Sequence, residues 1–188
     1  MLYCGLRRGE LLALTWRDVD ITNKTITISK AVYYVGNAAE VKPPKSKAGN
    51  RVVPIPDAIL PALQQRRRAS MLVCASRQAG GMMSNTAFRC AWDSYQHYLN
   101  IAAGGKDASR SNPKIQAVEP FTAHQLRHTY ATMLYDAGVD VLTAQRLLGH
   151  ADVQTTMRVY THLSAQKEQQ SIAALNAHIG AGIASIKF

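Results

Sequence analysis

The chain has 188 residues and a formal net charge of +10, with 22 Lys and Arg against 12 Asp and Glu. This length suits one domain, or one domain with a tail. The basic balance argues for a polyanionic partner, nucleic acid before an anionic membrane, but on charge alone a merely soluble basic protein is an equal alternative. No apolar run is long enough for a membrane span, the start MLYCGLRRGE has no signal-peptide core, and three widely spaced cysteines suit reduced thiols better than a disulfide framework or a zinc knuckle.

The first predicted element is a short helix over residues 6–14, LRRGELLAL, whose leucines face inward. Arg7 and Glu10 are neighbours on this helix at a spacing of three residues. A pair of this kind is most often a surface ion pair of little energetic value.

A small antiparallel sheet is predicted next, because polar and apolar residues alternate in short runs separated by turn signals. The stretch PPKSKAGN is a loop, from which Lys45 and Lys47 project either into solvent or into a DNA groove. Prolines keep the strand after this loop at an edge of the sheet. The predicted strands are 25–29, 31–35, 40–42 and 51–56.

The second half of the chain is predicted to be helical. Helices at 57–69 and 84–103 precede a loop-rich connection, and three capped helices follow between Phe121 and Leu163. The last of these is expected to place Val153, Met157 and Tyr160 on one face. The predicted N-caps are Thr122 (with Gln125 as its capping-box partner), Asp140 and Asp152, and the terminating glycines are Gly138 and Gly149.

Polar side chains gather at the junctions of these helices. His124, Arg127 and His128 fall off the apolar stripe of their helix, near an N-terminus that favours an anion. His124 and His128 also have the spacing of half a zinc site, but Gln125 stands where a zinc protease motif has glutamate. Taken alone, His150 would more often be a turn residue and Tyr160 a core residue.

Five motifs in order are GLRRGELLAL, PKSKAGNRVVP, AHQLRHTYAT, LLGHADVQTT and MRVYTHL. As a set they resemble the catalytic domain of tyrosine site-specific recombinases, the phage-integrase family, from Leu2 to about Leu163. The resemblance implies a mainly α-helical fold with a small antiparallel β-sheet (α+β). It also implies a catalytic domain over 1–163, lacking the upstream core-binding domain and its own first helices, and a C-terminal helix and tail over 164–188. We therefore expect this chain alone to bind DNA weakly and to recombine poorly.

The same resemblance implies roles for individual residues. Arg7 and Arg127 are the two catalytic arginines, supported by Glu10. His124 opens the HxxR motif, His150 is the later histidine, and Tyr160 is the nucleophile. Lys47 is the hairpin general acid, with Lys45 as a neighbouring candidate, and Lys45 and Arg51 are expected to contact DNA.

The chemistry accounts for these residue types. Arginine forks stabilise the extra negative charge on a phosphodiester under attack. Tyrosine needs help to lose its proton, because its ordinary pKa is about 10. A 3′-phosphotyrosine conserves the energy of the broken bond, so the expected reaction uses no nucleotide cofactor and no metal.

Two alternatives remain from the sequence. One is an enzyme similar to type IB topoisomerases, and the other is a non-catalytic DNA-binding remnant of a mobile element. For the recombinase, the family implies double-stranded DNA as substrate, a homotetramer that exchanges C-terminal helices, and accessory DNA-bending proteins. We expect a location in the bacterial cytoplasm or nucleoid, with no membrane partner.

Overall fold

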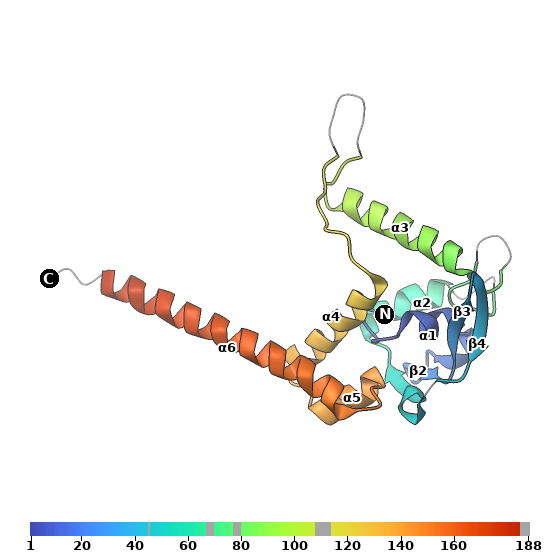
Figure 1. The fold of residues 1–188 in the computed structure, drawn as a ribbon, viewed down its shortest axis with the longest axis horizontal. Coiled ribbons are helices and arrows are strands. Elements are labelled where there is room, and N and C mark those ends of the chain that lie inside the picture. Colours follow the sequence, from blue (N-terminus) through green and yellow to red (C-terminus); the bar gives the residue numbers. More distant parts are fainter. Residues whose placement is uncertain (45, 67–69, 77–79, 108–113, 185–188) are drawn as a thin grey trace.

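A computed structural model describes residues 1–44, 46–66, 70–76, 80–107 and 114–184 (Figure 1). The helices are α1 (Arg8–Ala13), α2 (Leu60–Arg66), α3 (Asn85–Ala102), α4 (Ala123–Asp136), α5 (Val141–Leu148) and α6 (Val153–Ala184), with single 3₁₀ turns at Trp16–Asp18, Lys47–Gly49 and Asp57–Ile59. The strands are β1 (Val19–Asp20), β2 (Thr25–Ile28), β3 (Ala31–Val35), β4 (Ala38–Lys42) and β5 (Arg51–Pro54).

The strands form two antiparallel units where the sequence predicted one sheet. β1, β2 and β5 make a three-stranded sheet, in which Ile26 of β2 lies opposite Val53 of β5. β3 and β4 pair separately as a hairpin that turns at Gly36. The three-stranded sheet turns Ile26, Ile28 and Val53 into the main core, because side chains on one face of a strand recur at every second residue.

The β3–β4 hairpin packs against α1 and reaches the start of α3. Gly9 of α1 lies so close to β3 that an added Cβ would sit 2.5 Å from the Val32 carbonyl oxygen. At the hairpin tip, the Asn37 side-chain oxygen accepts hydrogen bonds from the Thr86 backbone N–H at 2.9 Å and from its hydroxyl at 3.0 Å. The hairpin therefore ties α1 to the N-terminus of α3.

The predicted caps of α4 and α5 are confirmed. The Thr122 backbone N–H donates to the Gln125 side chain at 2.6 Å, and Asp140 accepts from the first turn of α5. Gly138 and Gly149 both have the left-handed backbone, at φ 72° and 64°, that ends a helix. Local sequence alone was sufficient here, because a cap involves only neighbouring residues.

α6 differs from the prediction. The third capped helix and the separate terminal helix form one helix of 32 residues, about 48 Å long, which runs without a break through the expected boundary between residues 163 and 164. Its described side chains from residue 164 onward are exposed, and Figure 1 shows that part projecting from the body. Among the described residues, no helix is long and apolar enough to cross a membrane.

Candidate active site

Three arginines meet at the C-terminal end of α5. The last carbonyls of a helix have no partner within the helix and carry partial negative charge. Here each of three successive carbonyls accepts a hydrogen bond from an arginine of a different element. The pairs are Arg51 Nε with Leu147 at 2.9 Å, Arg127 Nη2 with Leu148, and Arg7 Nη2 with Gly149 at 2.8 Å.

Glu10 binds two of these arginines with one carboxylate. Arg7 donates to it from the backbone N–H and from Nη1, both at 2.8 Å, and Arg51 donates from Nη1 and Nη2, both at 2.9 Å. Burial alone would raise the pKa of Glu10, but the hydrogen bonds and charge of Arg51, with the hydrogen bonds of Arg7, lower it to about 2. Glu10 is therefore an anion at neutral pH, which supports the expectation that it holds Arg7.

The two predicted catalytic arginines differ in exposure. Arg127 is buried, and its Nη1 donates to the Gly5 carbonyl at 2.5 Å. Burial, followed by the charges of Arg7 and Arg51, lowers the pKa of Arg127 to about 9, so it stays protonated at neutral pH. The Arg7 side chain is 40% exposed and can still offer N–H groups to a ligand. Arg127, expected on a polar face of its helix, is in fact an internal cation.

The predicted histidines lie beside this group and are neutral. His150 follows Gly149, and its Nδ1 lies 2.9 Å from the hydroxyl of buried Thr156. Burial and then the charge of Arg127 and Arg7 lower the pKa of His150 to about 4. Burial, followed by His128 and Arg127, also lowers the pKa of His124, whose ring lies edge-on to His128 with centroids 4.6 Å apart.

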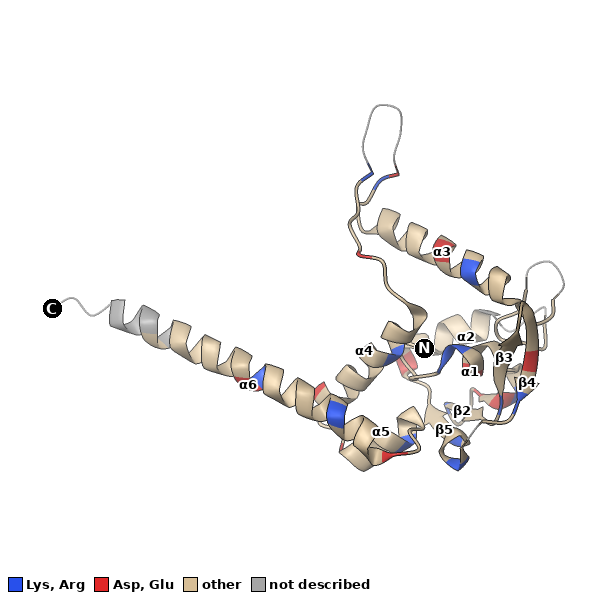
Figure 2. Ribbon diagram, viewed as in Figure 1, with Lys and Arg blue, Asp and Glu red and all other residues tan. Residues whose placement is uncertain are grey.

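Lys47 is exposed, and its loop lies against the turn that holds His150. A Cβ added to Gly149 would sit 2.9 Å from the Ala48 carbonyl oxygen and 2.7 Å from Arg51 Nη1. The basic loop and the Gly149–His150 turn are thus in contact, although they are about a hundred residues apart in sequence. Figure 2 shows basic positions on α1, on α4 and in this loop. Lys45 lies outside the described residues.

The position of Arg51 does not support the expectation that it contacts DNA. Its side chain is 2% exposed, and its guanidinium is bound by Glu10 and the Leu147 carbonyl. The strand periodicity was the available signal, because Arg51 and Val53 alternate with exposed neighbours and both face inward.

The contacts of the Tyr160 side chain lie outside the arginine group. Its hydroxyl donates to the Val139 carbonyl at 3.0 Å, and its ring packs edge-on against Tyr135 at 5.2 Å. Burial and then Asp140 raise its pKa. One helical turn earlier, Thr156 is fully buried against His150, whereas Met157 is 45% exposed. The inward face of α6 therefore carries Thr156, which the sequence analysis missed, in place of Met157.

The comparisons with known proteins identify the family. A family model described as the Phage integrase family matches residues 1–167. The chain belongs to the phage integrase family. A tyrosine recombinase XerC-like protein of Caldanaerobacter subterraneus is 31% identical, and the alignment covers 92% of this chain and 46% of that protein. The ICEBs1 integrase of Bacillus subtilis is 28% identical over 88% of this chain and 44% of its own.

Solved structures of the family show the same fold. The Tn1549 transposon integrase in complex with circular intermediate DNA has a TM-score of 0.65 and 25% identity, over 91% of this chain and 57% of that one. The XerA recombinase has a TM-score of 0.58 at 24% identity, over 92% and 54% of the two chains. The predicted mainly α-helical fold with small antiparallel β-structure is thereby confirmed, with two sheets in place of the one expected. The chain spans about half the length of the curated relatives that it matches.

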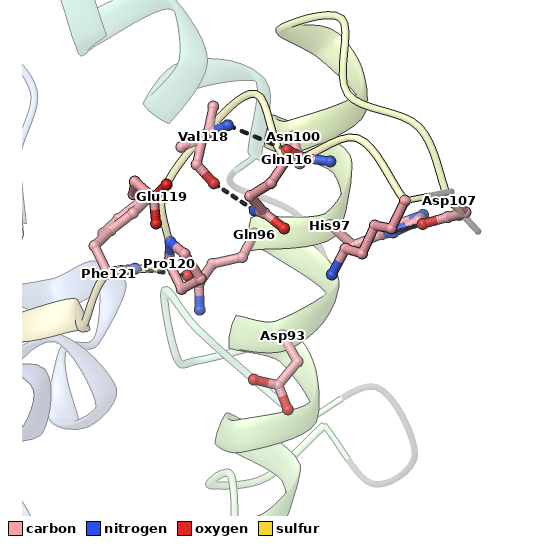
Figure 3. A pocket seen from close by; sticks show the side chains of 11 residues that line it. Asp93, Gln96, His97, Asn100, Asp107, Gln116, Val118, Glu119, Pro120 and Phe121 are labelled. Atoms are coloured by element: carbon pink, nitrogen blue, oxygen red, sulfur yellow. Dashed lines mark hydrogen bonds and ion pairs between the residues drawn. The ribbon is translucent and has the colours of Figure 1, made fainter. Parts of the chain in front are cut away.

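A separate hollow of about 200 Å³ lies between α3 and the segment that leads into α4 (Figure 3). Its lining includes Asp93, Asp107 and Glu119, a set of carboxylates that does not suit a phosphate. Asn100 and Gln96 instead bind the backbone of this segment, at Ala117 and Phe121 among other positions. None of the family's candidate catalytic residues lines this hollow. The side chains of Gln96 and Asn100 beside it attach the segment to α3.

Proposed function

We propose that the chain is the catalytic part of a site-specific tyrosine recombinase, an enzyme that cleaves and rejoins DNA strands. The observation that carries this proposal is the group of Arg7 and Arg127 with two neutral histidines at the end of α5. Such a group fits a phosphodiester, whose non-bridging oxygens gain negative charge when a nucleophile attacks. Buried Glu10 and the α5 carbonyls hold the arginines in place before the DNA arrives.

In the proposed reaction, the Tyr160 oxygen attacks the phosphorus atom and forms a 3′-phosphotyrosine. The bond from phosphorus to the 5′-oxygen breaks, and Lys47 gives that oxygen a proton, so that a 5′-hydroxyl leaves. A neutral imidazole, His124 or His150, accepts the Tyr160 proton or donates to a phosphate oxygen. Attack by a second 5′-hydroxyl on the phosphotyrosine reverses these steps and rejoins the DNA.

The proposed reaction requires Tyr160 to move. Its hydroxyl is bound to Val139 and lies in a site that raises its pKa, which disfavours the nucleophilic phenolate. Since Tyr160 lies one turn after Thr156, a local change at the start of α6 would carry it toward His150. We propose that bound DNA stabilises that arrangement.

For the assembly, we propose a homotetramer on DNA in which protomers exchange C-terminal helices. The support in this chain is the projecting part of α6, which exposes Ile172, Leu175 and Ile179. Apolar side chains repeated along a helix without a partner in the same chain suit docking on a neighbour.

The test is covalent capture on the protein at its natural length. Nicked fragments of the source genome are incubated with the protein, and the DNA bound through phosphotyrosine is isolated and sequenced. We expect one recurring site with the wild type, no adduct with Tyr160→Phe, and an unchanged adduct with the matched control Tyr98→Phe, which alters an exposed tyrosine of α3. An adduct that survives Tyr160→Phe refutes the assigned nucleophile.

A second assay distinguishes a recombinase from a topoisomerase and from a non-catalytic DNA-binding protein. Two duplexes carrying the captured site are mixed, one of them labelled. Exchange of the label between duplexes supports a recombinase. Relaxation of supercoiled DNA without exchange indicates a topoisomerase, and DNA binding without any adduct indicates a non-catalytic remnant.

A further inference from the structure

Arg51 is bound inside the protein by groups from three different segments. Its Nε donates to the Leu147 carbonyl of α5, and its Nη1 and Nη2 donate to the two oxygens of Glu10. Nη1 also lies 3.3 Å from the Gly49 carbonyl in the basic loop. The side chain is 2% exposed, and all three of its guanidinium nitrogens donate inside the protein.

Arg51 and Arg7 share each oxygen of Glu10. One oxygen accepts from Nη1 of both arginines, and the other accepts from Arg51 Nη2 and the Arg7 backbone. Fork-to-fork binding of this kind fixes the plane of a carboxylate as well as its position. The orientation of Glu10, and with it the direction of the Arg7 side chain, therefore depends on Arg51.

The charge of Glu10 depends on the same contact. A buried carboxyl group favours its neutral form unless a cation stabilises the anion. Arg51 provides the largest of the effects that keep Glu10 ionised. Without Arg51, Glu10 would be more easily protonated, and a neutral carboxyl group accepts a weaker hydrogen bond from Arg7.

We propose that Arg51 is a positioning residue for DNA cleavage: it acts through Glu10 on Arg7, and it fastens the basic loop to the end of α5. The inference rests on the proposed function, because it needs Arg7 to bind the phosphate under attack. It also assigns Arg51 no direct contact with DNA.

The experiment compares Arg51→Met and Arg51→Lys with the wild type on a nicked duplex carrying the captured site. We expect Arg51→Met to slow adduct formation by about 10²-fold, as for loss of one donor to a transition-state oxygen, with unchanged affinity for DNA. Arg51→Lys should be intermediate, since one ammonium group can pair with Glu10 but cannot form the fork. The matched control is Arg17→Met, which alters an exposed arginine outside the group and should change neither rate nor affinity.

A second substrate separates positioning from general damage. Replacing one non-bridging oxygen of the cleaved phosphate by methyl removes the charge that Arg7 would neutralise. On this methylphosphonate duplex, the loss from Arg51→Met should largely disappear, as should the loss from Arg7→Ala. An equal loss on both substrates, a weakened affinity for DNA, or an unchanged cleavage rate would each overturn the proposal.

Thermal unfolding of each variant checks that the variant is folded. Removing one partner of a buried ion pair is costly, whereas removing both is much less so. If Arg51→Met does not fold, the pair Glu10→Gln with Arg51→Met replaces it and should show the same loss confined to the phosphodiester. The two proposals fail separately: absence of any wild-type adduct contradicts the proposed function, whereas normal adduct formation in these variants contradicts only the role of Arg51.

Discussion

At the scale of single residues, His150 shows how the arginine group sets protonation. Its pKa of about 4 lies below the ordinary value of 6.5, because burial and the nearby arginines disfavour a further positive charge. Between the unfolded and folded pKa values, the unfolded state binds a proton that the folded state does not. The free energy of unfolding is therefore highest above the unfolded pKa and falls as the pH falls toward the folded pKa. His150 therefore weakens the fold between about pH 6.5 and pH 4.

We predict that removing this titration flattens the acid side of the stability curve. In His150→Gln, the free energy of unfolding measured in urea should fall less steeply between pH 6.5 and pH 4 than in the wild type. The wild-type cleavage rate should also show no step near pH 6.5 from His150, which is already neutral there. A cleavage step at that pH that is lost in His150→Gln would contradict the assignment.

Gly149 gives a second prediction at this scale. Its φ of 64° disfavours any side chain, and an added Cβ would meet Arg51 and the basic loop. We expect Gly149→Ala to destabilise the protein by about 1 to 3 kcal/mol from the backbone alone, and further from the clash. The matched control is Gly138→Ala, at φ 72° with no atom within 4 Å of the added Cβ. Equal losses in urea unfolding would show that the contact with Arg51 adds nothing.

At the scale of elements, the β3–β4 hairpin supports α3 from a distance in sequence. Asn37 at its tip caps Thr86, and Arg8 of α1 lies over the rings of Tyr34 and Phe88 at 5.3 and 5.1 Å. One exposed arginine thus contacts the hairpin and α3 together. These contacts link α1, which follows Arg7, to the position of α3.

We predict that Asn37→Ala lowers the free energy of unfolding by about 1 kcal/mol, the usual effect of losing a cap. Because the cap acts between elements, amide exchange in the first turn of α3 should quicken as well. The comparison is Ser84→Ala, which removes the cap that α3 receives from its own chain neighbour. If Asn37→Ala leaves exchange in α3 unchanged, the hairpin does not hold this helix.

At the scale of the whole molecule, the body and the projecting part of α6 differ in how far their side chains are buried. The body contains the core and the arginine group, whereas the described side chains of α6 after residue 163 are exposed. Changes in that part should therefore affect association and leave the body intact.

We predict that Ile172→Ser with Leu175→Ser changes the unfolding free energy by no more than about 0.5 kcal/mol, as for other exposed positions. The same pair should reduce assembly on DNA, measured by sedimentation with the captured duplex. The control is Gln169→Ser with Gln170→Ser on the same helix, which should leave assembly unchanged. Normal assembly of the apolar variant would contradict docking through this face.

The sequence by itself determined the family, the helix caps and most of the residues gathered at α5. Helix caps and the glycines that end helices involve residues within a few positions of one another, so they can be predicted from the local sequence. Arg7, His124, Arg127 and His150 were predictable from the motifs as a set. Their gathering in space follows from the fold that those motifs identify.

Only the tertiary structure decided the burial, the hydrogen-bond partners and the protonation of these residues. From the sequence, Glu10 was expected to support Arg7, and Arg51 was expected to contact DNA. In the structure, β5 brings Arg51 onto Glu10, and the end of α5 binds three guanidinium groups. The tertiary structure also showed that the Tyr160 hydroxyl is bound to the Val139 carbonyl. The physical reason is that burial and hydrogen bonding depend on contacts between distant segments, and those contacts set both the charge and the direction of each side chain.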